Sequence, residues 1–369
     1  MSTTVDTRVY NFSAGPATLP LSVLEEIQAD LMSYRGTGMS VMELSHRGKT
    51  FIEIMEDTAA RIRQLLSIPA EYEVLLLQGG GRLQNVMLPM NLITGPGQSA
   101  DYLLTGFWGV SSSEDVPHFG RLNKAFDGKS CNYSRLPQPG ELKLDPTAAY
   151  VHMTSNETIH GVQFQQFPET GAVPLVVDAS SELMSRPLDI SRFGAVYACA
   201  QKTSGIAGCT IVIIRRDLIE RGGDRVPGYL SYKKHADAAD KMLNTPPTFP
   251  IYVTGLICKW LQEEVGGLAQ LDRLNQEKAQ VVYDVLDRHS GFYRGHAERS
   301  ARSLMNAVFF TPNPQMDETF VTEARKHLLS DLRGHRVLGG IRASIYNAMP
   351  LEGVQTLAQF MNDFAIRHG

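Results

Sequence analysis

Short apolar runs alternate along the chain with longer segments in which apolar residues recur at helical spacing. Leu24, Ile27 and Leu31 lie three to four residues apart, and the segment Phe51–Leu66 repeats this spacing. Both segments are predicted to form amphipathic helices. The apolar run Glu73–Leu77 ends at three consecutive glycines, which is typical of a strand followed by a turn.

Further apolar runs predict more strands, most of them without the polar alternation of a half-exposed sheet. These strands are expected at Asp101–Thr105, Ala148–Met153, Pro174–Asp178, Ala195–Ala200 and Cys209–Ile214. Continuous apolar runs are typical of strands buried on both faces of a parallel sheet. Because helical stretches lie between several of them, we predict an α/β fold with a mostly parallel central sheet.

The pattern changes near Gly266, where Gly266 and Gly267 interrupt a helical run. A long helix is then expected to about Arg288. It is followed by a strand at Ala307–Thr311, a helix at Asp317–Leu329 and a strand at Ile341–Tyr346. We therefore predict a boundary here, with a smaller α+β domain formed by residues 266–369, a common domain size.

Composition and charge exclude several classes of protein. The 369 residues are 43% hydrophobic and 20% charged, which is ordinary for a globular chain of about two or three domains. With 35 basic and 39 acidic residues, the net charge of −4 disfavours nucleic acid as a partner. The nearly apolar stretch Gly205–Ile214 is far shorter than the ~20 residues that span a membrane. Met1–Val9 lacks the apolar core of a secretory signal.

The four cysteines indicate neither a metal site nor a disulfide framework. None forms a CxxC pair, so zinc ribbons and thioredoxin-like chemistry are disfavoured and no metal is expected. Cys199 and Cys209 lie within apolar runs, where free cysteine usually behaves as a small hydrophobic residue. This usage favours a reducing, cytoplasmic location.

The candidate chemistry lies at the ends of the predicted strands, where ligands bind in open α/β sheets. After the first strand, the glycines at 79–81 and Arg82 precede a helix pattern. Such a loop brings backbone N–H groups and a guanidinium toward an anion. A tight strand–helix turn would use the same glycines. No Lys-Ser/Thr pair follows, so this is not a nucleotide P-loop.

Three more strand ends carry polar or aromatic residues with two interpretations each. Trp108 could stack on a flat cofactor ring or be a core residue. Thr158 could bond a ligand oxygen or cap a turn. Asp178 ends an apolar strand, where a buried carboxylate needs a partner, so it could face a cationic ring nitrogen or cap the next segment.

Lys202 directly follows the apolar run that ends at Ala200. At the end of a buried strand it is a candidate Schiff-base nucleophile, although a lysine in such a place is often solvated. Taken together, an anion-binding loop, a stacking aromatic, a carboxylate and a lysine form the set that pyridoxal 5′-phosphate requires.

Several motifs resemble those of the phosphoserine aminotransferases, fold-type-I enzymes of the class-V aminotransferase group. The resemblance covers nearly the whole chain and is most specific in the C-terminal stretch that contains Gly340–Asn347. The motifs are Asn11–Pro16, Ser40–Gly48, Gly79–Arg82, Asn156–Ile159, Ala200–Lys202, Asn244–Phe249, Gly334–Arg336 and Gly340–Asn347. The resemblance implies a large cofactor-binding domain at 17–265, with residues 1–16 contributing to the small domain and the active site.

The resemblance also implies a role for each matching residue. Lys202 would carry pyridoxal 5′-phosphate, Asp178 would face its ring nitrogen, Trp108 would stack on the ring and Thr158 would contact its phenolic oxygen. The remaining implied contacts are Gly81, Arg82 and Gln201 to the cofactor phosphate, Asn244 and Thr245 to the same phosphate from a second subunit, Arg342 to the substrate α-carboxylate, and His46, Arg47, His335 and Arg336 to a distal phosphate or γ-carboxylate. The active sites of a homodimer would then be composite.

The implied reaction transfers the amino group of L-glutamate to 3-phosphooxypyruvate and gives O-phospho-L-serine and 2-oxoglutarate, a step of serine biosynthesis. The phosphorylated hydroxythreonine of pyridoxine biosynthesis is a further possible substrate. Each of these amino-acid substrates carries an α-carboxylate and a distal anion, and the planar fork of arginine suits both groups. Any one of these arginines alone could be a solvated surface charge, but two His-Arg pairs together with Arg342 on a predicted strand favour anion binding.

Some positions depart from the usual pattern of the family. Thr203–Ile206 stands where Asn-Ile-Gly-Pro is common, Ala14 stands where serine is frequent, and His160 replaces a small or acidic residue. No function is assigned to Ser111–Lys143, where the resemblance is poor.

Three alternatives remain. An alanine–glyoxylate-type aminotransferase would share the same cofactor residues. A cysteine desulfurase would need a mobile cysteine, for which Cys131 is the candidate. A non-catalytic pyridoxal-phosphate-binding module is disfavoured by the presence of both Lys202 and Asp178.

Overall fold

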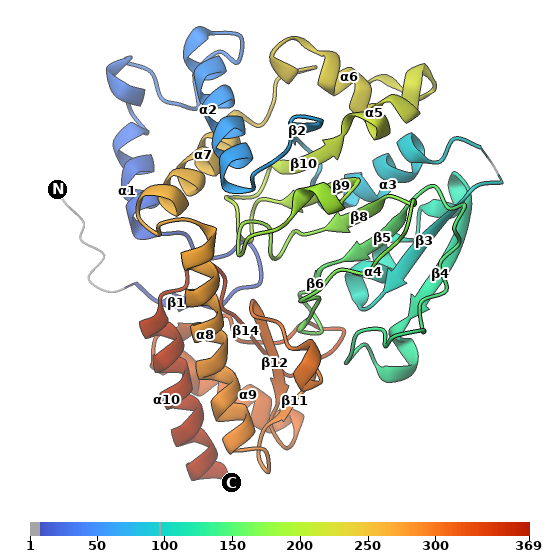
Figure 1. The fold of residues 1–369 in the computed structure, drawn as a ribbon. Coiled ribbons are helices and arrows are strands. Elements are labelled where there is room, and N and C mark those ends of the chain that lie inside the picture. Colours follow the sequence, from blue (N-terminus) through green and yellow to red (C-terminus); the bar gives the residue numbers. More distant parts are fainter. Residues whose placement is uncertain (1–7, 96) are drawn as a thin grey trace.

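A seven-stranded sheet forms the centre of the molecule (Figure 1). The computed structural model describes residues 8–95 and 97–369. The expectations for Met1–Val9 and for the start of the 1–16 segment therefore lie mostly outside the described residues. The strands run in the order β2 (Tyr72–Leu77), β10 (Thr210–Arg215), β9 (Ala195–Cys199), β8 (Leu175–Asp178), β5 (Val151–Thr154), β3 (Ser99–Leu104) and β4 (Arg121–Asp127).

Strand direction confirms the predicted α/β class with a mostly parallel sheet. All neighbours from β9 to β4 pair in parallel, whereas β10 is antiparallel to both β9 and β2. Since β10 alone is reversed, the other strands, β2 included, end at one edge of the sheet. Loops that follow these strands are thereby brought together, although they are far apart in the sequence.

Both faces of the sheet are covered by helices, which explains the continuous apolar runs. Along β2, Leu76 packs with helices α2 (Lys49–Leu65) and α7 (Thr248–Glu263), and the next position back, Leu75, packs with α3 (Gly80–Leu92) and α5 (Arg216–Gly222). Successive side chains of a strand point to opposite faces. An apolar residue is therefore needed at every position. The other helices of this part are α1 (Leu21–Asp30), α4 (Phe107–Ser112) and α6 (Tyr232–Asp237).

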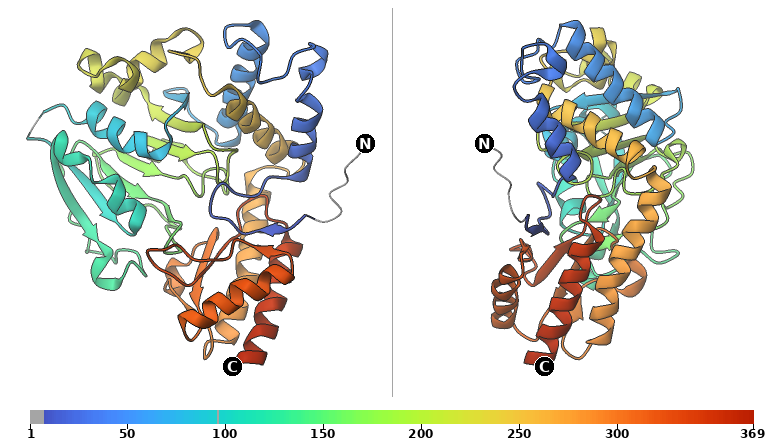
Figure 2. Two further views of the ribbon diagram at one scale, coloured as in Figure 1. Left: turned by 180° about the vertical axis from the view of Figure 1, so that it is seen from behind. Right: turned by 90° about the vertical axis from the view of Figure 1, so that its left-hand side faces the viewer.

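The C-terminal part has a hydrophobic core of its own beside a small antiparallel sheet (Figure 2). Its sheet runs in the order β11 (Arg294–Gly295), β12 (Asn306–Phe310) and β14 (Ile341–Ser344), and its helices are α8 (Leu268–Arg288), α9 (Pro314–Lys326) and α10 (Leu351–His368). The division of the chain at residue 266 stays a prediction.

The start of the chain also lies against this C-terminal part. Strand β1 (Tyr10–Asn11) pairs in parallel with β13 (Leu329–Ser330). The backbone N–H of Phe12 then donates to the carbonyl of Ser330 at 3.0 Å. Residues before the sheet domain are thus held by residues near the end of the chain.

The predicted helix at Asp317–Leu329 is wrong at both ends. It begins at Pro314, because the Asn313 side chain accepts a hydrogen bond from the N–H of Met316 and so caps the first turn. It ends at Lys326, and Leu328 takes a left-handed φ of 62° before β13 begins. The strand expected from Ala148 begins only at Val151, and the last strand ends at Ser344 rather than Tyr346.

Strand β4 was not predicted, because its sequence lacks an apolar run. Arg121 and Lys124 are exposed and Asn123 is half-buried, so polar side chains fill much of the strand. It lies at the edge of the sheet beside β3, where charged residues discourage pairing with another chain.

None of the helices in the described residues combines the length and the apolar character that crossing a membrane requires.

The C-terminal core offers a test of packing within one helix. On α10, Phe364 is fully buried against Phe320 with ring centroids 5.1 Å apart, whereas Ile366 is 73% exposed. We expect Phe364→Ala to lower the free energy of unfolding by about 3–5 kcal/mol and Ile366→Ala to change it by about 0.5 kcal/mol or less. Urea unfolding followed by circular dichroism measures both. Equal stability of the two variants would contradict this description of the core.

Candidate active site

A cavity of ≈ 370 Å³ lies at the edge of the sheet where the parallel strands end. It collects residues from seven separate segments of the chain. The predicted site residues that line it are Gly81, Arg82, Trp108, Thr158, Asp178, Gln201, Lys202, His335 and Arg342.

Lys202 lies at the centre of this set. Its Nζ donates a hydrogen bond to the Thr158 hydroxyl at 2.8 Å and stands 5.5 Å from the centroid of the Trp108 ring. Gly15 passes directly over the lysine: its φ is +142°, and a Cβ there would lie 3.2 Å from Lys202 Cγ. A larger residue at position 15 would therefore press on the lysine stem.

The glycine loop at residues 79–81 opens helix α3 toward the cavity. Gly79 and Gly80 have φ of +92° and +67°, and no side chain caps the helix. A Cβ at Gly79 would lie 2.3 Å from Leu83 Cδ2, so this turn requires glycine. The first N–H groups of a helix have no partner within it, and together with Arg82 they suit a phosphate.

Asp178 is the last residue of β8 and faces the same cavity. Its Oδ1 accepts a hydrogen bond from the backbone N–H of Ser180 at 2.9 Å. Burial raises the pKa of its carboxyl, more than the hydrogen bonds to Ser180 and the charge of Lys202 lower it. Within residues 8–95 and 97–369 no ion pair engages it, so a cationic group in the cavity would supply its missing partner.

Cys199 lies in a strand, as its apolar run predicted, but its thiol is not enclosed in the core. It ends β9, is only partly buried and lines the cavity. The backbone N–H of Gly81 donates to its Sγ at 2.8 Å. The apolar run did not indicate that Cys199 faces the cavity. The last residue of such a run looks like the buried residues before it, although it already lies at the edge where the site is formed. Cys131, the other candidate thiol, does not line the cavity.

Arg342 and His335 enter the cavity from the C-terminal part, one as a guanidinium and the other as an imidazole. Burial lowers the pKa of the Arg342 guanidinium. The pKa of His335 is also lowered. Burial is the largest cause, and the nearby charges of Arg342 and Arg336 lower it further. The His335 ring lies 5.8 Å from that of Phe107, beside Trp108. An anionic ligand beside Arg342 would compensate the desolvation of its guanidinium and would favour the protonated form of His335.

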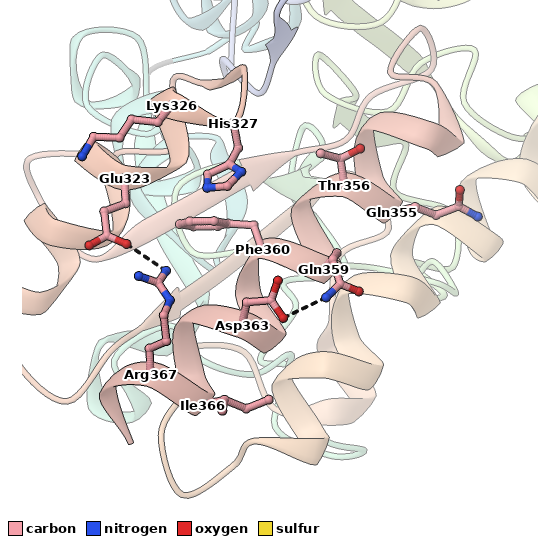
Figure 3. Close-up of a pocket in the computed structure, with 10 residues that line it drawn as sticks. All are labelled: Glu323, Lys326, His327, Gln355, Thr356, Gln359, Phe360, Asp363, Ile366 and Arg367. Atoms are coloured by element: carbon pink, nitrogen blue, oxygen red, sulfur yellow. Dashed lines mark hydrogen bonds and ion pairs between the residues drawn. The ribbon is translucent and has the colours of Figure 1, made fainter.

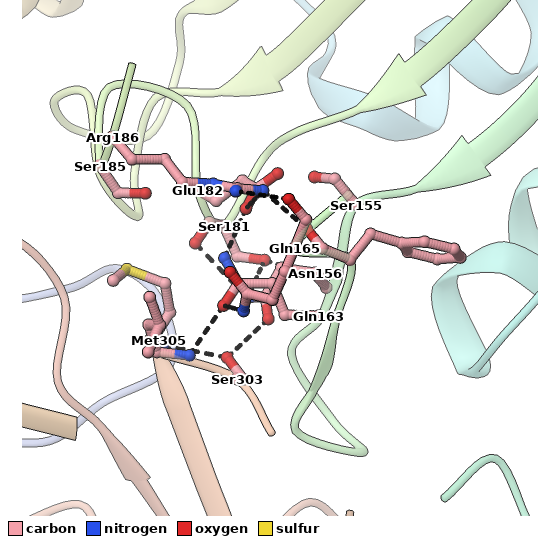
Figure 4. Close-up of polar contacts among 12 residues, drawn as sticks. Ser155, Asn156, Gln163, Gln165, Ser181, Glu182, Ser185, Arg186, Ser303 and Met305 are labelled. Carbon is pink, nitrogen blue, oxygen red and sulfur yellow. Dashed lines mark hydrogen bonds and ion pairs between the residues drawn. The ribbon is translucent and has the colours of Figure 1, made fainter. Parts of the chain in front are cut away.

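A buried polar network connects the two sides of the cavity (Figure 4). Asn156 Nδ2 donates to Ser181 Oγ at 2.7 Å and to Asn306 Oδ1 at 2.9 Å, and Asn156 Oδ1 accepts from the Ser303 hydroxyl at 2.6 Å. Asn306 Nδ2 continues to Ser344 Oγ at 2.9 Å. Strand β14, which carries Arg342, is thus linked to the loop that carries Thr158.

The family departures have simple structural outcomes. Ala14 contributes its backbone, since its carbonyl accepts a hydrogen bond from the Tyr346 hydroxyl at 2.9 Å. The carbonyl of Thr203 accepts from Asn347 Nδ2 at 3.3 Å, which ties the loop after Lys202 to the C-terminal part. His160 is buried and its ring lies 5.0 Å from that of Tyr133.

The other predicted residues lie outside the cavity. His46 Nδ1 and Thr245 Oγ1 are 3.5 Å apart, and Arg47 Nη2 donates to the carbonyl of Met242 at 2.9 Å. Asn244 is exposed beside Thr245, and the apolar side chains of Met42 and Leu243 are 55% and 37% exposed in the same region. Arg336 is exposed and does not line the cavity.

A larger depression of ≈ 990 Å³ lies between α9 and α10 (Figure 3). Its polar side chains are largely paired with one another, as Glu323 is with Arg367 at 2.9 Å and Gln359 with Asp363 at 2.8 Å. It holds no counterpart of the Lys202–Asp178 set. Among the described residues no cluster of three or more His, Cys, Asp or Glu could hold a metal ion.

Comparison with known proteins gives one family over nearly the whole chain. The sequence model of the aminotransferase class-V family matches residues 9–357. A phosphoserine aminotransferase from Rhodopirellula baltica is 48% identical over 362 residues, covering 98% of this chain and 96% of the relative. One from Chromobacterium violaceum is 49% identical over 363 residues, covering 98% of this chain and 99% of its own length.

Solved structures agree with the sequence comparison. A phosphoserine aminotransferase from Bacillus circulans subsp. alkalophilus superimposes with a TM-score of 0.95 at 43% identity, covering 98% of this chain and 99% of its own. The pyridoxal-phosphate-bound enzyme from Trichomonas vaginalis gives 0.90 at 39% identity, with coverages of 96% and 99%. An alanine–glyoxylate aminotransferase from Nostoc gives 0.76 at 16% identity, which shows a shared fold alone. The chain therefore belongs to the aminotransferase class-V family, as a member of its phosphoserine aminotransferase group.

Proposed function

We propose that this enzyme uses pyridoxal 5′-phosphate to transfer the amino group of L-glutamate to 3-phosphooxypyruvate, with O-phospho-L-serine and 2-oxoglutarate as products. One observation carries the proposal. A single cavity holds a lysine amine, a buried carboxylate with no ion-pair partner and an uncapped helix N-terminus, with Arg342 and His335 beside them. This combination suits one phosphorylated aromatic cofactor and a substrate with two anionic ends.

The cofactor would be held by residues that already face the cavity. Gly81, Arg82 and Gln201 would bind its phosphate, and Trp108 would cover its ring. Thr158, which now accepts a hydrogen bond from Lys202, would turn to the phenolic oxygen. Asp178 would lie against the ring nitrogen, where its charge favours the protonated form of that nitrogen.

The chain's own groups move the protons of the reaction. When bound, the cofactor supplies a carbonyl that joins the amino group and a ring that withdraws electrons from the adjacent carbon. Lys202 Nζ would remove the proton from the substrate Cα and return a proton on the other side of the transfer, as general base and then general acid. Trp108, whose ring centroid is 5.5 Å from Nζ, would stay beside this amine.

The substrate would be oriented by its two anionic ends. Arg342 would bind the α-carboxylate, since its guanidinium is buried at the cavity and presents a planar pair of donors. His335 and Arg336 would bind the distal phosphate or γ-carboxylate, together with His46 and Arg47 of a second subunit. 4-Phosphooxy-L-threonine also has a distal phosphate and is proposed as a further substrate in pyridoxine biosynthesis.

A two-fold homodimer would complete the site. His46, Arg47, Asn244 and Thr245 lie together on an exposed region with apolar Met42 and Leu243. Pairing this region with the cavity of a second copy would bury the apolar side chains and deliver the four polar ones to the cofactor phosphate and the distal anion. In each subunit, residues 17–265 would bind the cofactor, and residues 266–369 with the 1–16 segment would bring Arg342 and His335.

The alternatives lack a specific observation in their favour. An alanine–glyoxylate-type aminotransferase needs no cations for a distal anion, yet His335 lines this cavity beside Arg342. A desulfurase needs a mobile thiol. Cys131 instead lies in a short helical turn, where its thiol donates a hydrogen bond to the carbonyl of Gly128 at 3.1 Å. The four cysteines are all free thiols, which favours the proposed cytoplasmic, reducing location.

Lys202→Ala is expected to abolish turnover, because the variant has no amine to carry the cofactor or to move the Cα proton. Visible absorbance of the purified protein and a coupled transamination assay measure the two effects. Lys124→Ala, which removes an exposed lysine of the same part of the chain, should leave both unchanged. Wild-type turnover by Lys202→Ala would refute the role given to this lysine.

Subunit complementation tests the composite site. Lys202→Ala and Asn244→Ala chains are refolded together, so that one of the two sites in each mixed dimer has both residues intact. The mixture should recover up to about a quarter of wild-type activity, since half of randomly formed dimers are mixed. Sedimentation of the active protein as a monomer, or absence of recovery beyond the sum of the two parents, would contradict the arrangement.

Substrate specificity tests the two anion sites separately. Each charge-assisted contact contributes ~1.5–3 kcal/mol, so loss of two contacts lowers kcat/KM by roughly two to four orders of magnitude. Alanine and serine should therefore be poor donors, while phosphoserine and glutamate are good ones. Arg336→Ala should reduce the difference in kcat/KM between the good and the poor donors. Arg342→Ala should instead lower kcat/KM for all four substrates. A wild-type preference for alanine would exclude the proposed reaction.

A further inference from the structure

Glu157 contacts the backbone at the start of the helix that carries Trp108. It belongs to the short hairpin β6 (Asn156–Glu157) and β7 (Val162–Gln163), and its side chain is fully buried. Its Oε2 accepts the backbone N–H of Trp108 at 3.0 Å, and its Oε1 accepts that of Gly109 at 2.7 Å. These two donors belong to the first turn of α4.

This carboxylate takes the place of a helix cap. Gly106, the residue before α4, has no side chain to accept the first N–H groups, which an N-cap side chain normally does. A Cβ at Gly106 would lie 2.4 Å from Glu157 Cδ. The absence of a side chain at position 106 is therefore what allows a glutamate from another segment to reach the helix start.

Glu157 has no cation in direct contact among the described residues. The titratable groups that face it are Asp178, which raises the pKa of its carboxyl, Lys202, which lowers it, and the Tyr133 phenol. Burial is the largest effect and raises the pKa of Glu157 to about 7, against the hydrogen bonds from Trp108 and Gly109. His160, whose Nδ1 is 3.4 Å from the backbone nitrogen of Phe107, is kept neutral by burial.

We propose that Glu157 is the positioning residue for Trp108: its carboxylate fixes the first turn of α4 and so sets where the indole ring stands over the cofactor. Its consequence for catalysis rests on the proposed function, because the position of the Trp108 ring affects the reaction only when a cofactor ring is bound beneath it. The geometry of the proposal rests on the contacts above. The ionised carboxylate accepts both N–H groups through charged oxygens, whereas in the protonated acid the oxygen that carries the proton is a weaker acceptor.

The position of Trp108 should therefore respond to the charge of Glu157. The chain contains two tryptophans, and the other, Trp260, lies on α7 outside the cavity. In a Trp260→Phe parent, Trp108 becomes the only indole emitter and reports its own surroundings.

The test records Trp108 emission of this full-length parent, as holoenzyme and after removal of the cofactor, between about pH 5.5 and 8.5. We expect the cofactor-free parent to show a transition near neutral pH. Glu157→Gln keeps the size of the side chain but cannot ionise, so the transition should disappear. Glu182→Gln is the matched control, because Glu182 is equally buried but contacts Gln163 and Arg186 instead of α4; it should keep the transition.

Activity of the same variants supplies the second measurement. Glu157→Gln holoenzyme should lose roughly tenfold in kcat with little change in KM for phosphoserine, because the indole rather than the substrate contacts is displaced. Persistence of the emission transition in Glu157→Gln, its absence in the parent, or an unchanged kcat would overturn the proposal. Emission needs neither cofactor nor substrate. A chain inactive on phosphoserine that keeps the expected emission behaviour would refute only the proposed reaction.

Discussion

The site depends on a constraint of sheet geometry: strands that run in the same direction end at the same edge. The glycine loop follows β2, Trp108 follows β3 and Thr158 follows β5, while Asp178 is the last residue of β8 and Lys202 follows β9. No two of these segments are adjacent in the sequence. Because their strands share one direction, the residues meet without any long loop. Rigid strands also fix each residue more firmly than loops of their own could.

A second constraint concerns polar groups that are buried between the two cores. Asn156, Ser181, Ser303 and Asn306 are almost inaccessible to solvent, and each finds a partner in the others. An unpaired polar group in such a place costs free energy, so the network tolerates only one arrangement of the two parts. The position of Arg342 relative to Lys202 is thereby set in part by hydrogen bonds, beside the apolar packing of Leu268 and Leu271 of α8 into the core of the large part.

Most of the fold could be predicted because burial on both faces leaves a clear trace in the sequence. The strands that carry the site, β2, β3, β5, β8 and β9, were all expected from apolar runs. The polar edge strand β4 left no such trace, and β1 and β13 are too short to give a pattern. The predicted end of the helix at Leu329 was wrong, because the spacing of apolar residues does not reveal that Leu328 adopts a left-handed backbone conformation.

Within the site, sequence reasoning selected residues with distinctive chemistry and missed those that act through position. Lys202, Asp178 and Trp108 stand out as residue types, and the structure brings them to one cavity. Cys199 and Glu157 do not stand out. Cys199 is simply the end of an apolar run in the sequence. The contacts of Glu157 are with backbone groups some fifty residues earlier in the chain. No local pattern can record a contact of that range.

The pairing of β1 with β13 has a consequence for biosynthesis. Tyr10 leaves the ribosome early, but its partner Leu329 follows more than three hundred residues later. Gly15, which covers Lys202, lies close after β1, and neither the β1–β13 pairing nor the bond from Phe12 to Ser330 can form before that partner has emerged. A nascent chain can therefore complete its central sheet before the pairing that anchors the N-terminal segment is possible. Translation order makes the N-terminal segment one of the last to take its final position.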